Sequence, residues 1–175
     1  TNKAAAEMKE RIIKLVGNDA RNIWMGTFHS IFAKILRFEA EKLGYISSFT
    51  IYDTDDSKSA IKQIIKSLNL DPKAYNVGYV LGRISMAKSN LISCEEYANN
   101  AEIQQADQAA RKPMIGEIYK LYNQRLRNSM AMDFDDLLYN MNVLLRDYPE
   151  VLLKYQERFK HILVDEYQDT NFSQY

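Results

Sequence analysis

Apolar residues recur along this chain at two spacings. Over the first 70 residues, segments with apolar side chains three or four positions apart alternate with short unbroken apolar runs. The first spacing predicts amphipathic helices, and the second predicts strands buried on both faces. The predicted strands are Ile23–Met25 and residues 49–53, which read FTIYD. Such alternation is typical of a parallel sheet flanked by helices.

Capping residues and glycines mark the ends of the predicted helices. Thr1 or Asn2 caps a first helix, which Gly17 ends. A second helix is predicted over about residues 30–43, and Asp53 caps a third. The first part of the chain is therefore predicted to alternate helix, strand, helix, strand and helix.

The pattern changes after residue 70, because the segment up to about residue 130 carries helical signals only. We predict an all-helical subdomain over 71–130, inserted into an α/β domain formed by 1–70 and 131–175. In the last segment Asp133 caps a strongly amphipathic helix, and Pro149 opens another. The chain then returns to a predicted strand at 162–164.

Composition excludes several kinds of site. Lysine plus arginine and aspartate plus glutamate each number 23, so net charge gives no sign of a nucleic-acid or membrane partner. Cys94 is the only cysteine, which excludes an internal disulfide and fits a reducing compartment such as the cytoplasm. One cysteine and two histidines cannot form a Cys/His zinc site. No apolar run approaches the roughly 20 residues of a membrane helix.

Two adjacent carboxylates, Asp165 and Glu166, follow the last apolar run. Ligands of open parallel sheets bind beyond the carboxyl ends of the strands, where these acids are predicted to lie. Neighbouring strand residues point to opposite sides, so one carboxylate can hold Mg²⁺ while the other accepts a proton from an attacking water. The alternative is a solvated turn with a helix cap, because short matches of this kind arise by chance.

The longer string around these acids, LVDEYQDTN at 163–171, resembles helicase motif II of superfamily 1 DNA helicases of the UvrD/PcrA/Rep type. Three further matches follow the family's order. TNKAAAEMKERI at 1–12 resembles part of motif Ia, and GTFHS at 26–30 resembles motif Ib. AMDFDDLL at 131–138 resembles the segment that re-enters the first RecA-like domain. The resemblance covers the whole chain, and its closing motif is specific.

The resemblance implies a partial RecA-like parallel sheet flanked by helices, with a helical insertion, in a motor that uses ATP and Mg²⁺. Asp165 would hold the metal ion, Glu166 would activate water, and Gln168 would couple the nucleotide to DNA. The family moves 3′ to 5′ on single-stranded DNA and acts at junctions of single- and double-stranded DNA. The DNA path would be lined by residues of two motifs: Thr1, Asn2, Lys3, Thr27, Phe28, His29 and Ser30.

The chemistry of these residue types also allows other roles. Small polar residues at a helix N-terminus suit a phosphate, because free backbone N–H groups point there. An aromatic ring such as Phe28 can stack on a base, which contributes about 1–3 kcal/mol. The alternatives are a solvated Lys3, a core Phe28 and a His29 that caps a helix.

A phosphate-binding loop of the form G-x-x-x-x-G-K-[S/T] does not occur in the 175 residues. The resemblance places that loop before Thr1, and places a second RecA-like domain with its arginine finger after Tyr175. We therefore expect an internal segment of a longer motor that hydrolyses no ATP by itself. Two hypotheses stay open beside it. One is a non-catalytic DNA- or protein-binding module with a degenerate motor fold, and the other is a related motor fused to a nuclease.

Overall fold

The computed structural model describes residues 2–174, without the side chains of Asn2, Asn18 and Arg21, so the predicted cap Thr1 lies outside the described range. No helix in that range is long and apolar enough to cross a bilayer.

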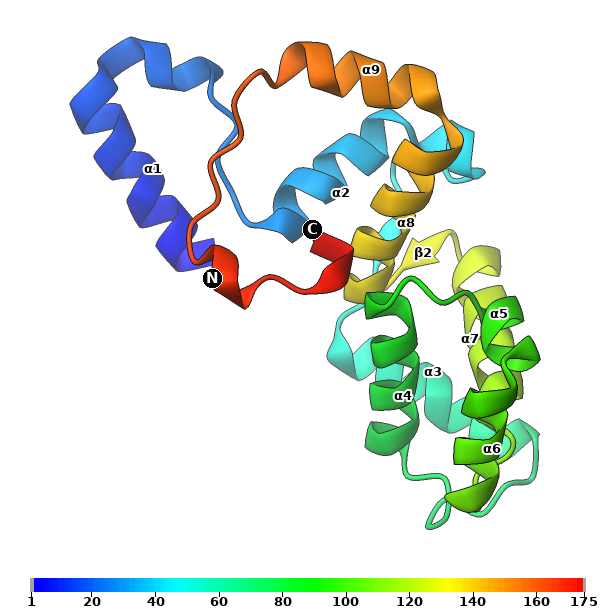
Figure 1. The fold of residues 1–175 in the computed structure, drawn as a ribbon. Coiled ribbons are helices and arrows are strands. Elements are labelled where there is room, and N and C mark those ends of the chain that lie inside the picture. Colours follow the sequence, from blue (N-terminus) through cyan, green and yellow to red (C-terminus); the bar gives the residue numbers. More distant parts are fainter. Residues whose placement is uncertain (1, 175) are drawn as a thin grey trace.

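Helices dominate the fold (Figure 1). The elements in chain order are α1 Asn2–Val16, η1 Gly17–Asn22, α2 Phe28–Phe38, η2 Ala40–Leu43, β1 Thr50–Ile51, α3 Thr54–Ser67, α4 Val77–Ser89, α5 Cys94–Asn99, α6 Ala101–Ala109, α7 Ile115–Asn128, β2 Ala131–Met132, α8 Phe134–Asp147, α9 Pro149–Arg158, η3 Tyr167–Asp169 and η4 Phe172–Gln174, where η marks a short 3-10 helix.

A two-stranded parallel sheet joins segments that are far apart in the sequence. Thr50 of β1 is paired with Ala131 of β2, and Ile51 is paired with Met132. The backbone N–H of Tyr52 donates to the Met132 carbonyl at 2.8 Å. Parallel strands need a long crossover connection, which the helices α3 to α7 provide here. The predicted strand at 49–53 is confirmed for Thr50 and Ile51 alone, whereas β2 was not predicted because two residues carry no readable alternation.

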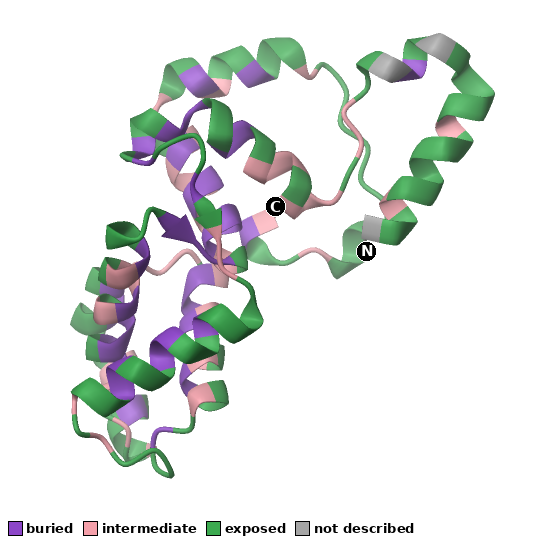
Figure 2. Ribbon diagram, turned by 180° about the vertical axis from the view of Figure 1, so that it is seen from behind, coloured by how far each residue is buried: buried purple, intermediate pink, exposed green. Residues whose placement is uncertain are grey.

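Two hydrophobic cores lie on either side of this sheet. One holds buried side chains of α3, α4, α5 and α7, and the other holds those of α2, η2, α8 and α9. Figure 1 shows the two groups of helices above and below β2, and Figure 2 shows their buried faces turned inward. The chain passes from the first core to the second between Ala131 and Met132. Helix α3 packs against α4 and α7 rather than against α2.

Local helix signals are confirmed. The Asp53 carboxylate accepts hydrogen bonds from the first turn of α3, and the Asp133 carboxylate does the same for α8. Pro149 is the first residue of α9. The helix predicted over residues 30–43 is two helices, α2 and η2, and Gly44 ends η2 with a φ of 73° that favours glycine.

Two predicted strands, Ile23–Met25 and Ile162–Val164, are wrong. Both runs are extended connections without regular structure, and 98% of Leu163 is exposed instead of being buried on both faces. In Figures 1 and 2 the two connections run close to each other between α1 and the rest of the chain. In the part that the structure describes, the only paired strands are β1 and β2. An apolar run forms a buried strand only where neighbouring strands satisfy its backbone groups, and these runs have none.

Helix α1 stands apart from both cores (Figure 1). It packs against η1, and its apolar positions include the exposed residues Met8, Leu15 and Val16. Leu15 is 85% exposed. The helix predicted at the start of the chain is therefore present, and much of its apolar face is exposed.

Candidate nucleotide and DNA site

The two candidate carboxylates lie on an exposed turn. The Glu166 backbone is left-handed, with φ 52° and ψ 42°, and its N–H donates to Asp165 Oδ1 at 3.1 Å. Gln168 Nε2 donates to Glu166 Oε2. The predicted placement on opposite sides of a strand end is wrong, because there is no strand and the chain turns at Glu166. The structure does place the side-chain amide of Gln168 against the carboxylate of Glu166, the candidate base.

The carboxylates of Asp165 and Glu166 suit a magnesium ion that is shared with a nucleotide. No group of three or more histidine, cysteine, aspartate or glutamate side chains gathers within the described range. Magnesium does not need such a group, because it binds through one or two carboxylates, several waters and the phosphates of a nucleotide. Asp165 and Glu166 are both exposed, so their carboxylate oxygens are open to such a shared site. The residues therefore fit a metal that arrives with a nucleotide.

Thr27 caps the start of α2, where four of the candidate DNA residues lie. Its Oγ1 accepts a hydrogen bond from the Ser30 backbone N–H at 3.3 Å, and its carbonyl accepts one from Ser30 Oγ at 2.8 Å. The alternative in which His29 is the cap is therefore wrong. At Gly26 a Cβ atom would lie 2.3 Å from Ser30 Oγ, so a side chain there would displace the serine.

Aromatic rings gather around this helix start. The Phe28 ring is half-buried and meets the Phe32 ring edge-on, with centroids 5.7 Å apart. Phe28 is therefore not a residue of the closed core. The His29 ring meets the ring of Phe134 on α8 at 5.6 Å, and half of Phe134 is exposed. Phe134 is a candidate that sequence reasoning missed, although an exposed aromatic residue at the first position of an otherwise amphipathic helix was the available signal.

Burial and a nearby carboxylate both act on the pKa of His29. Burial lowers the pKa of His29, and the nearby Asp135 carboxylate acts in the opposite direction. Burial raises the pKa of Asp135, and a side-chain hydrogen bond with Ser85 of α4 opposes that rise. The starts of α2 and α8 and the middle of α4 thus meet at one place.

The third group of candidates, at the start of α1, is only partly described. Thr1 lies outside the described residues and the side chain of Asn2 is not described, while Lys3 is exposed on the first turn. Figures 1 and 2 both show the start of α1 beside η3, which follows Glu166 directly. The fold therefore brings the segment that resembles motif Ia next to the segment that resembles motif II.

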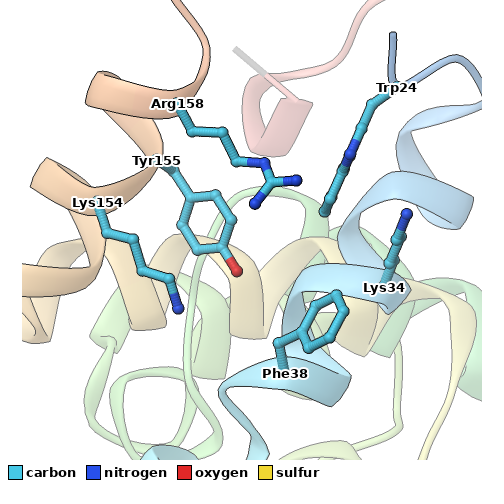
Figure 3. Close-up of a pocket in the computed structure, with 6 residues that line it drawn as sticks. All are labelled: Trp24, Lys34, Phe38, Lys154, Tyr155 and Arg158. Carbon is cyan, nitrogen blue, oxygen red and sulfur yellow. The ribbon is translucent and has the colours of Figure 1, made fainter. Parts of the chain in front are cut away.

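A hollow of about 330 Å³ lies elsewhere, between α2 and α9 (Figure 3). Trp24 lines it, with Lys34 Nζ 3.9 Å and the Arg158 guanidinium carbon 4.8 Å from the ring centroid. Lys154 pairs with the buried Glu39 carboxylate. The cationic side chains that line this hollow thus contact aromatic rings or a carboxylate. None of the predicted site residues lines it.

Comparison with known proteins agrees with the motif order. Residues 1–175 match the UvrD/REP helicase N-terminal domain family. The chain is 42% identical to the ATP-dependent DNA helicase PcrA of Leuconostoc citreum, and 43% identical to the proteins of that name from Staphylococcus aureus strain Mu50 and Staphylococcus epidermidis strain RP62A. Each comparison covers 100% of this chain but 23% of the relative. Because the family match extends over its whole length, the chain belongs to the UvrD/REP helicase N-terminal domain family.

Proposed function

We propose that this chain is part of an ATP-dependent DNA helicase that moves 3′ to 5′ on single-stranded DNA and opens duplex DNA at junctions. The carrying observation is the family match over residues 1–175, within which the string LVDEYQDTN supplies both acids that phosphoryl transfer needs. Three relatives named ATP-dependent DNA helicase PcrA support the same activity. The chain spans 23% of their length, so the proposed activity is that of the longer protein.

The acids have separate tasks in this proposal. Bound Mg-ATP supplies the phosphoryl group that is transferred to water. Asp165 holds the metal ion, because an exposed carboxylate suits a hard, hydrated cation. Glu166 accepts the proton of the attacking water. Gln168 orients this base through the hydrogen bond from its amide nitrogen to the Glu166 carboxylate.

The proposed DNA path runs past the start of α2. The backbone N–H groups of Phe28 and His29, at the start of this helix, suit a phosphate, and Phe28 supplies a half-buried ring on which a base can stack. Lys3 adds a positive charge from the start of α1, beside η3. Phe134 extends this surface, because its half-exposed ring lies against His29. Thr1, Asn2 and Thr27 complete the proposed path.

The exposed apolar segments are proposed contacts with the rest of the motor. Leu15 and Leu163 are almost fully exposed, and large exposed apolar surfaces mark interfaces. We infer that 71–130 is the helical insertion of a RecA-like domain in the longer protein, and that the exposed runs Ile23–Met25 and Ile162–Val164 contact the rest of that protein. The missing phosphate loop then lies outside these 175 residues, and the isolated chain hydrolyses no ATP.

A strand-separation assay tests the proposal. The full-length protein is mixed with ATP, Mg²⁺ and duplexes that carry a single-stranded tail on either the 3′ or the 5′ side. The proposal predicts rapid opening of the 3′-tailed duplex and little opening of the other. Binding of single strands with no ATP hydrolysis would instead support the non-catalytic binding module. Hydrolysis with the opposite tail preference would refute the direction alone.

A further inference from the structure

A lysine is completely buried where the two hydrophobic cores meet. The Lys88 side chain, on α4, is 1% exposed, and its Nζ lies 2.8 Å from Asp133 Oδ2 and 2.7 Å from Asp136 Oδ1. An isolated buried ammonium group is strongly unfavourable, so this lysine depends on its two partners. A buried ion pair is often no more stabilising than packed apolar side chains of the same size. The placement of this lysine between two acids points instead to a role in fixing geometry.

The carboxylates that hold Lys88 also form the start of α8. The Asp136 backbone N–H donates to Asp133 Oδ1 at 2.8 Å, and the Asp133 N–H donates to Asp136 Oδ2 at 3.1 Å. The Tyr122 hydroxyl of α7 donates to Asp133 Oδ2 at 2.9 Å. Every carboxylate oxygen of the pair thus has a partner, and α4 and α7 are both bonded to the first turn of α8.

This cluster joins the two halves of the fold. Tyr122 belongs to the core of α3, α4, α5 and α7, whereas Leu137, one residue after Asp136, belongs to the core of α2, α8 and α9. The next side chains on the same turn are Phe134 and Asp135, which meet His29 of α2. A movement of α4 relative to α8 would therefore shift Phe134 and Asp135 relative to His29, on the proposed DNA path.

We propose that Lys88 is a positioning residue for DNA binding: by tying α4 and α7 to the first turn of α8, it fixes the helical half of the chain relative to the start of α2. The inference rests on the proposed function, because it assumes that the α2 start and Phe134 contact the strand. Lys88 is fully buried and does not touch the DNA itself.

A matched pair of variants separates positioning from stability. The triple variant Lys88→Met, Asp133→Asn and Asp136→Asn removes the ionic tie without leaving a buried charge, and its amide oxygens can still cap α8. The control, Arg83→Met with Asp107→Asn, removes the Arg83–Asp107 pair of 2.9 Å inside the helical half, again without leaving a buried charge. The amide oxygen at residue 107 can still accept the hydrogen bond from the Tyr97 hydroxyl. Both changes are made in the full-length protein.

Binding to an oligothymidine is measured at several salt concentrations, together with the distance between spin labels at residues 62 and 156. The first label lies on α3 and the second on α9, one in each half of the chain. We expect the triple variant to bind about tenfold more weakly with an unchanged salt slope, because its phosphate contacts are intact. Its distance distribution should broaden, and the control should bind within about twofold of the wild type with an unbroadened distribution.

Three outcomes would count against the inference. Wild-type affinity in the triple variant, an unbroadened distance distribution in it, or an equal loss of affinity in the control would each show that Lys88 has no positioning role. A wild-type protein that does not bind the oligothymidine would refute the proposed function instead, so the two failures are distinguishable.

Discussion

Removing the Tyr97 hydroxyl should loosen the helical half of the chain much more than removing the Tyr119 hydroxyl. Both side chains are at most 2% exposed, and their rings pack edge-to-face with centroids 5.8 Å apart. Tyr97→Phe and Tyr119→Phe therefore each delete one hydroxyl group from a buried ring. The two variants differ in the partner that each hydroxyl has.

The partners set the expected magnitudes. The Tyr97 hydroxyl donates to Asp107 Oδ2 at 2.7 Å, and a hydrogen bond to a charged group contributes about 1.5–3 kcal/mol. The Tyr119 hydroxyl donates to the Ile92 carbonyl at 3.0 Å, and a neutral hydrogen bond contributes about 0.5–1.5 kcal/mol. Since about 1.4 kcal/mol is a factor of ten, Tyr97→Phe should raise the local opening equilibrium about 10- to 150-fold. Tyr119→Phe should raise it about 2- to 12-fold.

Native-state hydrogen exchange measures this opening directly, because it reports the free energy of local unfolding for each segment. The amides to follow are those of α5 and α7, on which Tyr97 and Tyr119 lie. Equal acceleration of exchange in the two variants would refute the reasoning. So would a larger effect of Tyr119→Phe, because the charge of Asp107 would then contribute nothing to the bond.

Three further predictions concern titration, backbone conformation and DNA contact. Burial raises the pKa of Asp136 to about 6, with Lys88 opposing it, so the folded chain holds a proton that the unfolded chain releases. The thermal stability of the wild type relative to Asp136→Asn should therefore fall as the pH rises from about 4 to about 6 and level off above that range. Gly17→Ala should lower the hydrogen-exchange protection of the α1 end by about 1 kcal/mol because its φ is +72°, whereas Gly82→Ala should raise that of α4 by about 0.5–1 kcal/mol because nothing lies within 4 Å of the new methyl group. Phe28→Ala should weaken single-strand binding in a fluorescence titration about 5- to 150-fold, while Phe38→Ala, at the other end of α2, should leave it within about twofold.

Features that depend on neighbouring residues could be predicted from the sequence. The caps Asp53 and Asp133 and the glycine stop at Gly44 act within one helical turn, so their residue types suffice. Asp165, Glu166 and Gln168 were predicted as one group, and the bond between Gln168 and Glu166 joins residues two positions apart. This contact is therefore local, whereas the strand predicted to precede the two acids is absent.

Features that depend on distant partners could not be predicted. The runs at 23–25 and 162–164 have strand composition, but pairing needs neighbours that the described residues do not provide. Lys88 gave no signal, because lysine is normally exposed and its partners are far away in sequence. Asp133 was predicted only as the cap of α8, and the role that it shares with Asp136 in holding a buried lysine was not foreseen.

Glu166 is proposed to activate the water that hydrolyses ATP in a DNA-driven motor. The most direct test is the steady-state rate of ATP hydrolysis by the full-length protein, with and without single-stranded DNA, for the wild type and for Glu166→Gln. DNA should stimulate hydrolysis by the wild type, and the variant should lose at least about 100-fold in rate, as expected when a general base is removed. The affinity of the variant for the strand should stay within about twofold of the wild type. A variant that hydrolyses ATP at the wild-type rate would contradict this role of Glu166.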